Sequence, residues 1–259
     1  MKSNITLISS MGLGACSGPL STLDPAGPSA QSVSVLSWIM LVFLTLVLAA
    51  VTALWLYAVY RQPTPAAQGI DLADNDSKLT RQHAVWIIGG GLVFPTVSML
   101  ILLAVSIPVG NLMSGLPSEA DQALRIQVTA HQWRWQIDYL DGTSDNNLAS
   151  TQNALHIPVN APVHLYLSSA DVIHSFWVPR LAGKLDMIPG RTNELRIQAD
   201  EPGVYPGLCA EFCGLAHATM RFAVHVHSRD DFNQWIDSQR QQVDTVRLEL
   251  LQGEVPSGE

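Results

Sequence analysis

Two long stretches without a charged side chain constrain the fold of this chain more than any other feature. Residues 33–60 and 84–110 contain no Asp, Glu, Lys or Arg. About 20 consecutive apolar residues are enough for a helix to cross the hydrocarbon core of a bilayer. The alternative, two buried helices of a soluble core, is disfavoured because such helices are seldom this long. We therefore interpret both stretches as transmembrane helices, and a purely soluble protein is excluded.

The residues around these stretches predict the topology. The first stretch ends in Trp55, Tyr57 and Tyr60, which is typical of an aromatic belt at a membrane surface. The loop 61–83 contains the basic residues Arg61, Lys78 and Arg81, and such loops stay on the cytoplasmic side. We therefore expect a tight helical hairpin with a cytoplasmic loop and with both chain ends on the opposite side.

The segment before the first helix has the pattern of a processing signal. Lys2 is followed by a short apolar run and then by Leu13, Gly14, Ala15 and Cys16. This pattern resembles a bacterial lipoprotein signal, which implies removal of residues 1–15 and acylation of Cys16. The alternative is an unprocessed leader with an incidental cysteine, because two serines interrupt the apolar run. Residues 16–32 would then form an external N-terminal segment.

The 149 residues after the second stretch are enough for one globular domain. They contain 18 acidic and 10 basic residues, and so carry the whole net charge of −8. This surface repels phosphate, which excludes a nucleic-acid binder that works by bulk charge. Short alternating segments separated by Pro and Gly predict an all-β sandwich or barrel over residues 111–229. The spacing of apolar residues predicts a helical tail over residues 230–259.

One short motif carries the chemistry. Cys209, Cys213, His217 and Met220 lie within twelve residues of sequence. Thiolate, imidazole and thioether are soft ligands, which select copper over magnesium or calcium. Two cysteines could bridge a pair of copper ions, and His174, a polar residue in an apolar segment, is the candidate for a second histidine. A disulfide and a zinc site are the alternatives, and the methionine disfavours zinc.

Because of this motif and His174, the chain resembles subunit II of the cytochrome c oxidases in the haem-copper family. The resemblance covers both membrane helices and the external domain, and it implies a cupredoxin-like fold with a dinuclear copper centre, CuA. It implies the following ligands: the side chains of His174, Cys209, Cys213, His217 and Met220, and the backbone carbonyl of Glu211. It also implies that the Glu211 side chain helps to bind magnesium or manganese at the boundary with subunit I.

The resemblance implies the function as well. In this family cytochrome c reduces the two copper ions, which pass the electron to haem in subunit I, where oxygen is reduced. Subunits I and III and cytochrome c would be the partners, and the copper domain would face the periplasm from a bacterial inner membrane. Quinol oxidases share the fold but lack the copper ligands, so the complete set argues against them. A membrane-tethered copper-delivery or storage protein is the alternative from another class.

The resemblance assigns roles to residues outside the copper motif. Trp133 is implied to accept the electron from cytochrome c, whereas we interpret Trp135 as a packing residue. Arg134 stands where a tyrosine is expected. Acidic side chains would steer a lysine-rich cytochrome c by complementary charge. They are Asp138, Asp141, Asp145 and Asp171.

Several histidines remain. His83 stands where many relatives have a glutamate at the mouth of a proton channel, and histidine can also carry protons near neutral pH. We expect either a proton-uptake role for it or a place at the membrane interface. The others have no partner pattern, so we expect them to be structural; they are His156, His164, His225 and His227. A haem-attachment motif C-x-x-C-H does not occur, so we expect the electron donor to be a separate protein.

Overall fold

The computed structural model describes residues 17–61, 81, 83–113, 124–140 and 147–252. The chain divides into two units, and each has its own architecture. One unit spans Val35–Gly110, and the other combines Met1–Ser34 with Asn111–Glu259. The candidate residues Cys16, Asp141 and Asp145 lie outside the described residues.

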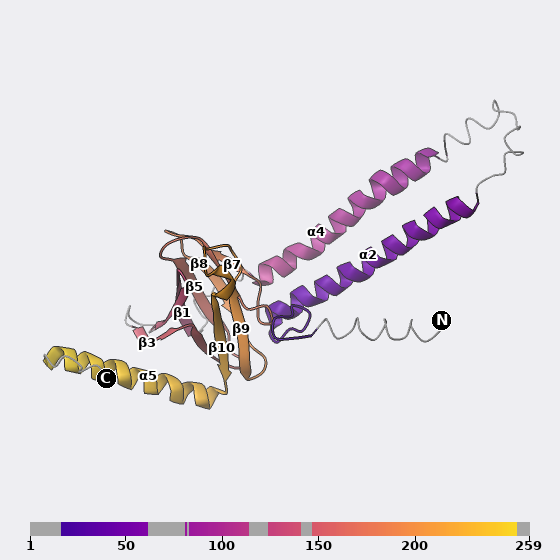
Figure 1. The fold of residues 1–259 in the computed structure, drawn as a ribbon. Helices are drawn as coiled ribbons and strands as arrows, with labels where there is room; N and C mark the ends of the chain where they lie inside the picture. Colours follow the sequence, from indigo (N-terminus) through magenta and orange to yellow (C-terminus); the bar gives the residue numbers. More distant parts are fainter. Residues whose placement is uncertain (1–16, 62–80, 82, 114–123, 141–146, 253–259) are drawn as a thin grey trace, which may run out of the picture. The chain divides into compact units, whose positions relative to one another are not determined.

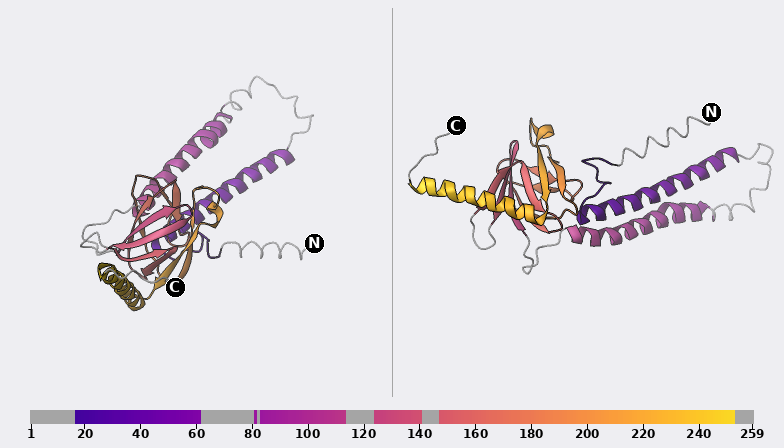
Figure 2. Two further views of the ribbon diagram at one scale, coloured as in Figure 1. Left: turned by 60° about the vertical axis from the view of Figure 1, so that its left-hand side comes forward. Right: turned by 90° about the horizontal axis from the view of Figure 1, so that it is seen from below.

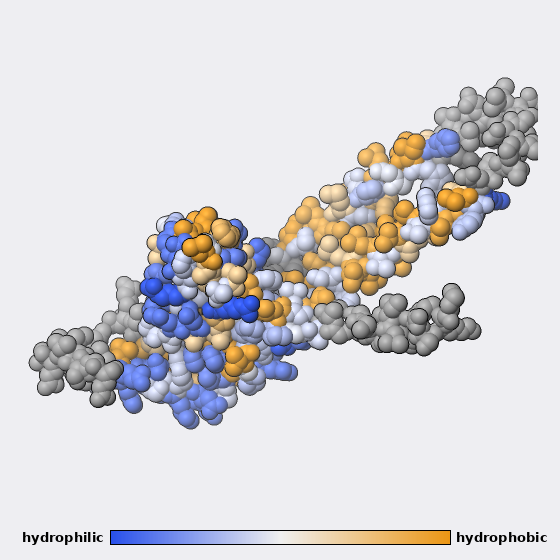
Figure 3. Space-filling view, viewed as in Figure 1, coloured by the Kyte–Doolittle hydropathy of each residue, from blue (hydrophilic) through white to orange (hydrophobic). Residues whose placement is uncertain are grey.

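Two long apolar helices form the first unit. They are α2 (Pro28–Tyr60), whose first turns belong to the other unit, and a second helix that starts as the π-helix η3 (Val85–Val93) and continues as α4 (Phe94–Met113). Both are long and apolar enough to cross a membrane. They run side by side (Figures 1 and 2), and the rings of Phe43 and Phe94 stack with their centroids 6.2 Å apart. Their surface is largely apolar (Figure 3), as expected for helices in contact with lipid.

The second unit is built on two five-stranded sheets within the described residues. Their strand orders are β3-β2-β1-β5-β8 and β4-β10-β9-β6-β7. Parallel pairing joins β1 to β5 and β4 to β10, and the other neighbours are antiparallel. The strands are β1 (Leu124–His131), β2 (Arg134–Leu140), β3 (Asn147–Gln152), β4 (Ala154–Pro158), β5 (Val163–Ser169), β6 (His174–Trp177), β7 (Leu185–Met187), β8 (Asn193–Ile197), β9 (Gly203–Cys209) and β10 (Arg221–His227).

Alternation of side chains explains why these strands form a sandwich. In β1 the side chains of Ile126, Val128 and Ala130 are buried, and the residues between them are not. Successive side chains of a strand point to opposite faces of the sheet, so one face of each sheet is apolar. The inner faces of the two sheets meet in one core. The predicted all-β, cupredoxin-like sandwich is therefore confirmed.

The C-terminal helix α5 (Arg229–Gln252) lies along the β-sandwich (Figure 2) and contacts β3, β4 and β10. Ser228 caps its first turn, because the hydroxyl accepts a hydrogen bond from the backbone N–H of Asp231 at 3.2 Å. Phe232 and Ile236, four residues apart on one face of the helix, are buried in the core. Trp235 is partly buried against the same core, so the apolar side chains of this region hold α5 on the sandwich.

The segment before α2 is tied to the β-sandwich by polar contacts. Arg180 forms an ion pair with Asp24 at 3.2 Å, and its Nε donates to the Asp24 carbonyl at 2.7 Å. The backbone N–H of Ala26 donates to the carbonyl of Arg180 at 2.7 Å. Gly27 follows directly, and a Cβ there would lie 2.2 Å from the carbonyl oxygen of Gln198. Only glycine allows this close approach of the two backbones.

We expect truncation of Trp135 to weaken the sandwich strongly. Its side chain is fully buried, with ring centroids 4.9 Å from Phe222 and 5.9 Å from Phe176. Trp135→Ala should lower the free energy of unfolding by about 3–5 kcal/mol, because a cavity replaces these contacts. Chemical denaturation of the full chain in detergent measures the loss. Trp133→Ala is the matched control at a partly exposed position, and an equal loss in both variants would contradict the packing role.

Candidate metal centre

Strand pairing brings the first two site residues together. His174 is the first residue of β6, and Cys209 is the last residue of β9. These strands are antiparallel neighbours, with Phe176 opposite Cys209. The hydrogen-bonded ladder therefore holds the imidazole beside the thiol, although 35 residues separate them in the sequence.

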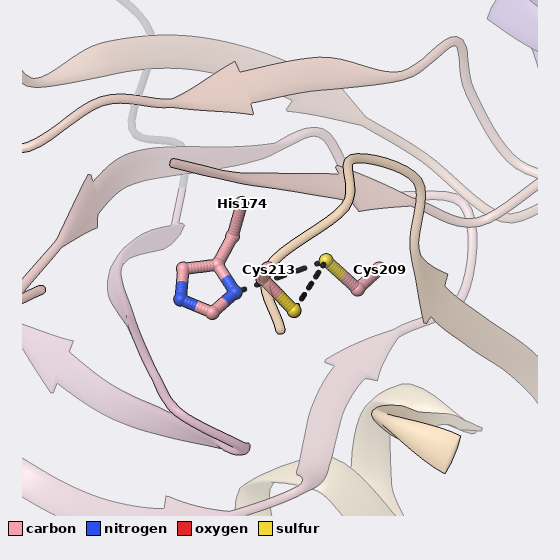
Figure 4. A group of neighbouring side chains, drawn as sticks. All are labelled: His174, Cys209 and Cys213. Carbon is pink, nitrogen blue, oxygen red and sulfur yellow. Dashed lines mark hydrogen bonds between the residues drawn. The ribbon is translucent and has the colours of Figure 1, made fainter. Parts of the chain in front are cut away.

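The loop after β9 adds the second thiol. The Sγ atoms of Cys209 and Cys213 lie 3.8 Å apart, and Nδ1 of His174 lies 3.8 Å from the Cys209 sulfur. Figure 4 shows the imidazole and both sulfurs turned toward one another. The two cysteines are free thiols, at a separation far beyond the roughly 2.05 Å of a disulfide bond. The three ligand atoms lie within 4.8 Å of one another, close enough to share metal ions.

The remaining residues of the motif converge on the same two sulfurs. Nδ1 of His217, at the start of the short helix η4 (His217–Thr219), lies 3.7 Å from the Cys213 sulfur. The thioether of Met220 lies 3.7 Å from the same sulfur. On the other side, the carbonyl oxygen of Glu211 lies 3.2 Å from the Cys209 sulfur. All six sequence-predicted ligand groups therefore lie in one cluster.

The donors are arranged as two half-sites that share a pair of sulfurs. Cys209 is flanked by an imidazole and a carbonyl oxygen, and Cys213 is flanked by an imidazole and a thioether. A single tetrahedral zinc ion binds four ligands and has little use for a thioether. Two thiols with two imidazoles, a thioether and a carbonyl around them fit a pair of copper ions better.

The thiols lie in an apolar setting that excludes water. Cys209, Cys213 and Met220 are each at most 3% exposed, and His174 is fully buried. Burial, together with the neighbouring Cys209 thiol, raises the pKa of Cys213 to about 12. Without a cation the Cys213 thiol therefore stays protonated at neutral pH. Metal binding must displace this proton, so metal affinity depends on pH.

Asp171 fixes the orientation of the buried imidazole. Its carboxylate accepts hydrogen bonds from Nε2 of His174 at 2.9 Å and from the backbone N–H of Gln132 at 2.7 Å. Partial burial acts to raise the pKa of Asp171, but the hydrogen bonds from His174, Gln132 and Val172 outweigh it and hold the pKa below its ordinary value. With Nε2 held in this way, Nδ1 faces the sulfurs.

Trp133 connects the molecular surface with the cysteine loop. Its side chain is 38% exposed, and its indole Nε1 donates to the carbonyl oxygen of Cys213 at 3.3 Å. The side-chain amide of Gln132 donates to the same oxygen at 2.8 Å. The next residue in the loop, Gly214, has a φ of +118°, and a Cβ there would lie 3.2 Å from the Trp133 ring. The glycine thus permits both the turn and the close packing of the indole.

Two features of the site were not predicted. Gln132 was not singled out, because nothing in the sequence indicates that it reaches a carbonyl 81 residues away. Asp171 was predicted to dock a partner, and it also holds a site histidine; its spacing of three residues before His174 was the available signal.

Other candidates lie elsewhere in the described residues. Asp138 lies on β2, where it accepts a hydrogen bond from Gln136. The side chain of Glu211 is exposed, and His83 is exposed at the beginning of the second apolar helix.

The fold and the site define a class: a cupredoxin-like sandwich with a Cys and His metal site, linked to two apolar helices. Comparisons with known proteins agree. A family model described as "Cytochrome C oxidase subunit II, periplasmic domain" matches residues 142–227. Cytochrome c oxidase subunit 2 of Alkalihalophilus pseudofirmus is 34% identical over 232 residues, which are 87% of this chain and 64% of that protein. Over most of its length the chain is thus similar to subunit 2 of cytochrome c oxidases.

Further relatives show the same likeness. The probable cytochrome c oxidase subunit 2 of Rickettsia bellii is 34% identical over 163 residues, which cover 57% of this chain and 61% of that protein. The crystal structure of the periplasmic domain of subunit II of cytochrome oxidase of Bradyrhizobium japonicum is 31% identical. It matches 49% of this chain and 97% of that domain, with a TM-score of 0.41. The chain thus spans less than two thirds of the length of both curated relatives.

The raised pKa of the buried thiol has a measurable consequence. At pH 8 the Cys213 thiol of the copper-free chain should react with iodoacetamide about 1,000-fold more slowly than an ordinary exposed cysteine, because the thiolate is the nucleophile. Mass spectrometry of peptides after timed labelling measures the rate. Unfolding the same sample in guanidinium should restore ordinary reactivity. Rapid labelling of Cys213 in the folded chain would contradict a buried, protonated Cys213 thiol.

Proposed function

We propose that this chain is the electron-transfer subunit of a respiratory terminal oxidase and holds a dinuclear copper centre. The ligands would be His174, Cys209, Cys213, His217, Met220 and the carbonyl of Glu211. The observation that carries the proposal is the pair of free thiols 3.8 Å apart, each beside one imidazole, in a chain similar to subunit II of cytochrome c oxidases. When bound, the copper pair supplies a site that gains and loses one electron, with the charge shared between two ions.

The protein's part in this reaction is to keep the ligands fixed. His174 and Cys209 lie on paired strands, and Asp171 holds the outer nitrogen of the imidazole. Burial of the two thiols keeps water away from them. Ligands that move little between two charge states lower the reorganisation that accompanies each electron transfer.

Trp133 is the proposed acceptor of the electron from cytochrome c. It combines an exposed ring with a hydrogen bond to the backbone of a copper ligand. Acidic residues would steer the basic donor, and Asp171 suits this role because its side chain is 32% exposed. Asp138, Asp141 and Asp145 complete the proposed docking set. Arg134, exposed on the same segment, would modulate the choice of donor.

The rest of the assembly is proposed from the family. Subunits I and III would be the partners, with haem in subunit I and the copper domain in the periplasm of a bacterial inner membrane. The exposed Glu211 carboxylate would contribute one ligand to a magnesium or manganese ion shared with subunit I. His83 would take up protons. Cleavage after residue 15 and acylation of Cys16 would add a lipid anchor.

Copper binding tests the proposal directly. The purified full chain should bind two copper ions and give a seven-line hyperfine pattern in electron paramagnetic resonance, because one electron is shared by two nuclei. Cys213→Ser should abolish the pattern. Cys16→Ser should leave it unchanged, which makes it the matched control. One copper per chain, a four-line spectrum or a silent oxidised sample would contradict the dinuclear centre, and silence would favour a copper carrier.

Replacement of Trp133 should separate electron uptake from copper binding. Trp133→Phe keeps a ring but loses the N–H donor to the Cys213 carbonyl. In the assembled oxidase, stopped-flow reduction by cytochrome c should slow about tenfold, equivalent to about 1.4 kcal/mol of activation free energy. The copper spectrum should not change. Trp55→Phe in α2 is the control, and normal uptake in the Trp133 variant would refute the assigned role.

A further inference from the structure

Three histidines gather on the outer face of the second sheet, outside the metal centre. His156 lies on β4, and His225 and His227 lie on the neighbouring parallel strand β10. His156 and His225 are directly opposite each other in the register, and their rings stack at 4.7 Å with an interplanar angle of 13°. Strand pairing between segments about 70 residues apart therefore creates a cluster that no local sequence pattern indicates.

Two of these imidazoles share one hydrogen bond. Nδ1 of His156 lies 2.8 Å from Nε2 of His227, and the angle between the planes of the two rings is 10°. One nitrogen must donate and the other must accept, so this contact requires one hydrogen between the two atoms. If both imidazoles become cations, both facing nitrogens carry hydrogen, and the bond is replaced by a repulsive contact.

The same pair is covered by helix α5. The indole of Trp235 stacks on His156 with centroids 4.2 Å apart and an interplanar angle of 5°. Trp235 also meets the edge of the buried Tyr139 ring, and Tyr139 hydroxyl accepts a hydrogen bond from the backbone N–H of His156 at 2.6 Å. The stack of Trp235 on His156 is therefore a main side-chain contact between the polar helix and the sheet.

The charges that face the pair oppose protonation of His156. Burial lowers the pKa of His156 to about 4, helped by His225 and His227. Burial and His225 also lower the pKa of His227, and Asp231 on α5 acts in the opposite sense. Buried Tyr139 on β2 has a raised pKa, so it stays neutral. The described residues of β3 contain no ionisable side chain, and those of β9 include only Tyr205 and Cys209.

We propose that the hydrogen-bonded pair His156 and His227 is a proton-sensitive latch, which holds α5 on the β-sandwich when neutral and releases it on acidification. The first proton is accommodated on His227, near Asp231, while the pair keeps its hydrogen bond. The second proton, on His156, leaves two donors facing each other beneath Trp235. Release of α5 lets both imidazoles reach water, where cations are solvated.

The direction of the pH effect follows from linkage. In the released state both histidines titrate near their ordinary pKa of about 6.5, and in the docked state they titrate lower. The contribution to docking is therefore complete above about pH 6.5 and declines as the pH falls toward 4. From the value for His156, the ratio of released to docked α5 should rise about 100-fold between pH 7 and pH 4.

Hydrogen exchange of the full chain in detergent tests the latch. We expect the protection of backbone amides in residues 235–243, corrected for intrinsic exchange rates, to fall about 100-fold from pH 7 to pH 4. Amides of β1 should stay protected, since the release is local. His156→Phe combined with His227→Gln keeps a ring under Trp235 but removes both titrating groups, so the fall should shrink to less than about threefold. His131→Gln, outside the cluster, is the matched control and should behave like the unaltered chain.

Three results would overturn the latch. They are unchanged protection of α5 at pH 4 in the unaltered chain, a parallel loss in β1 that reveals global acid unfolding, and a full pH effect in the double variant. If the double variant fails to dock α5 even at pH 7, the pH series of the unaltered chain still decides. The readout is independent of copper, so it stands or falls separately from the electron-transfer role.

Discussion

The candidate metal centre depends on one constraint, which is that two sulfur atoms are held side by side in a buried place. The strand β9 delivers Cys209, and the following loop turns back to place Cys213 3.8 Å away. Burial makes two neighbouring thiolates costly without cations between them. The loop geometry thus prepares a site that is complete only with metal ions of soft character. The same loop positions the carbonyl of Glu211, the imidazole of His217 and the thioether of Met220 beside the sulfurs, and β6 positions the imidazole of His174.

The packed core of the sandwich holds the candidate metal ligands rigidly. Trp135 fills the space between the sheets beneath His174, with ring centroids 6.4 Å apart. Asp171 and Gln132 connect the histidine, the cysteine loop and the indole of Trp133 through hydrogen bonds. These contacts join three segments that are distant in the sequence. Through them the proposed point of electron uptake is held next to the candidate ligands.

Local patterns in the sequence account for much of the fold. Absence of charge predicted the two apolar helices, and alternation around Ile126 and Val128 predicted strands, because burial is a local signal with a defined period. The chemical character of Cys209, Cys213 and Met220 predicted soft ligands. Gln132 and the pair of His156 and His227 could not be predicted, because their partners are set by strand register across long separations. The start of α2 at Pro28, five residues before the start of the predicted helix, was also missed, although proline favours the first turn of a helix.

The loop from Cys209 to Met220 should tolerate insertions less well than the strands around it, which is the opposite of the usual situation. Loops normally accept insertions and vary among relatives, while strands are conserved for packing. Here five of the six proposed ligand groups come from twelve consecutive residues, and Gly214 must fit beneath an indole. One added residue would move an imidazole or a sulfur away from the other ligand groups. Evolution is therefore freer to remodel the sheets than to lengthen this connection.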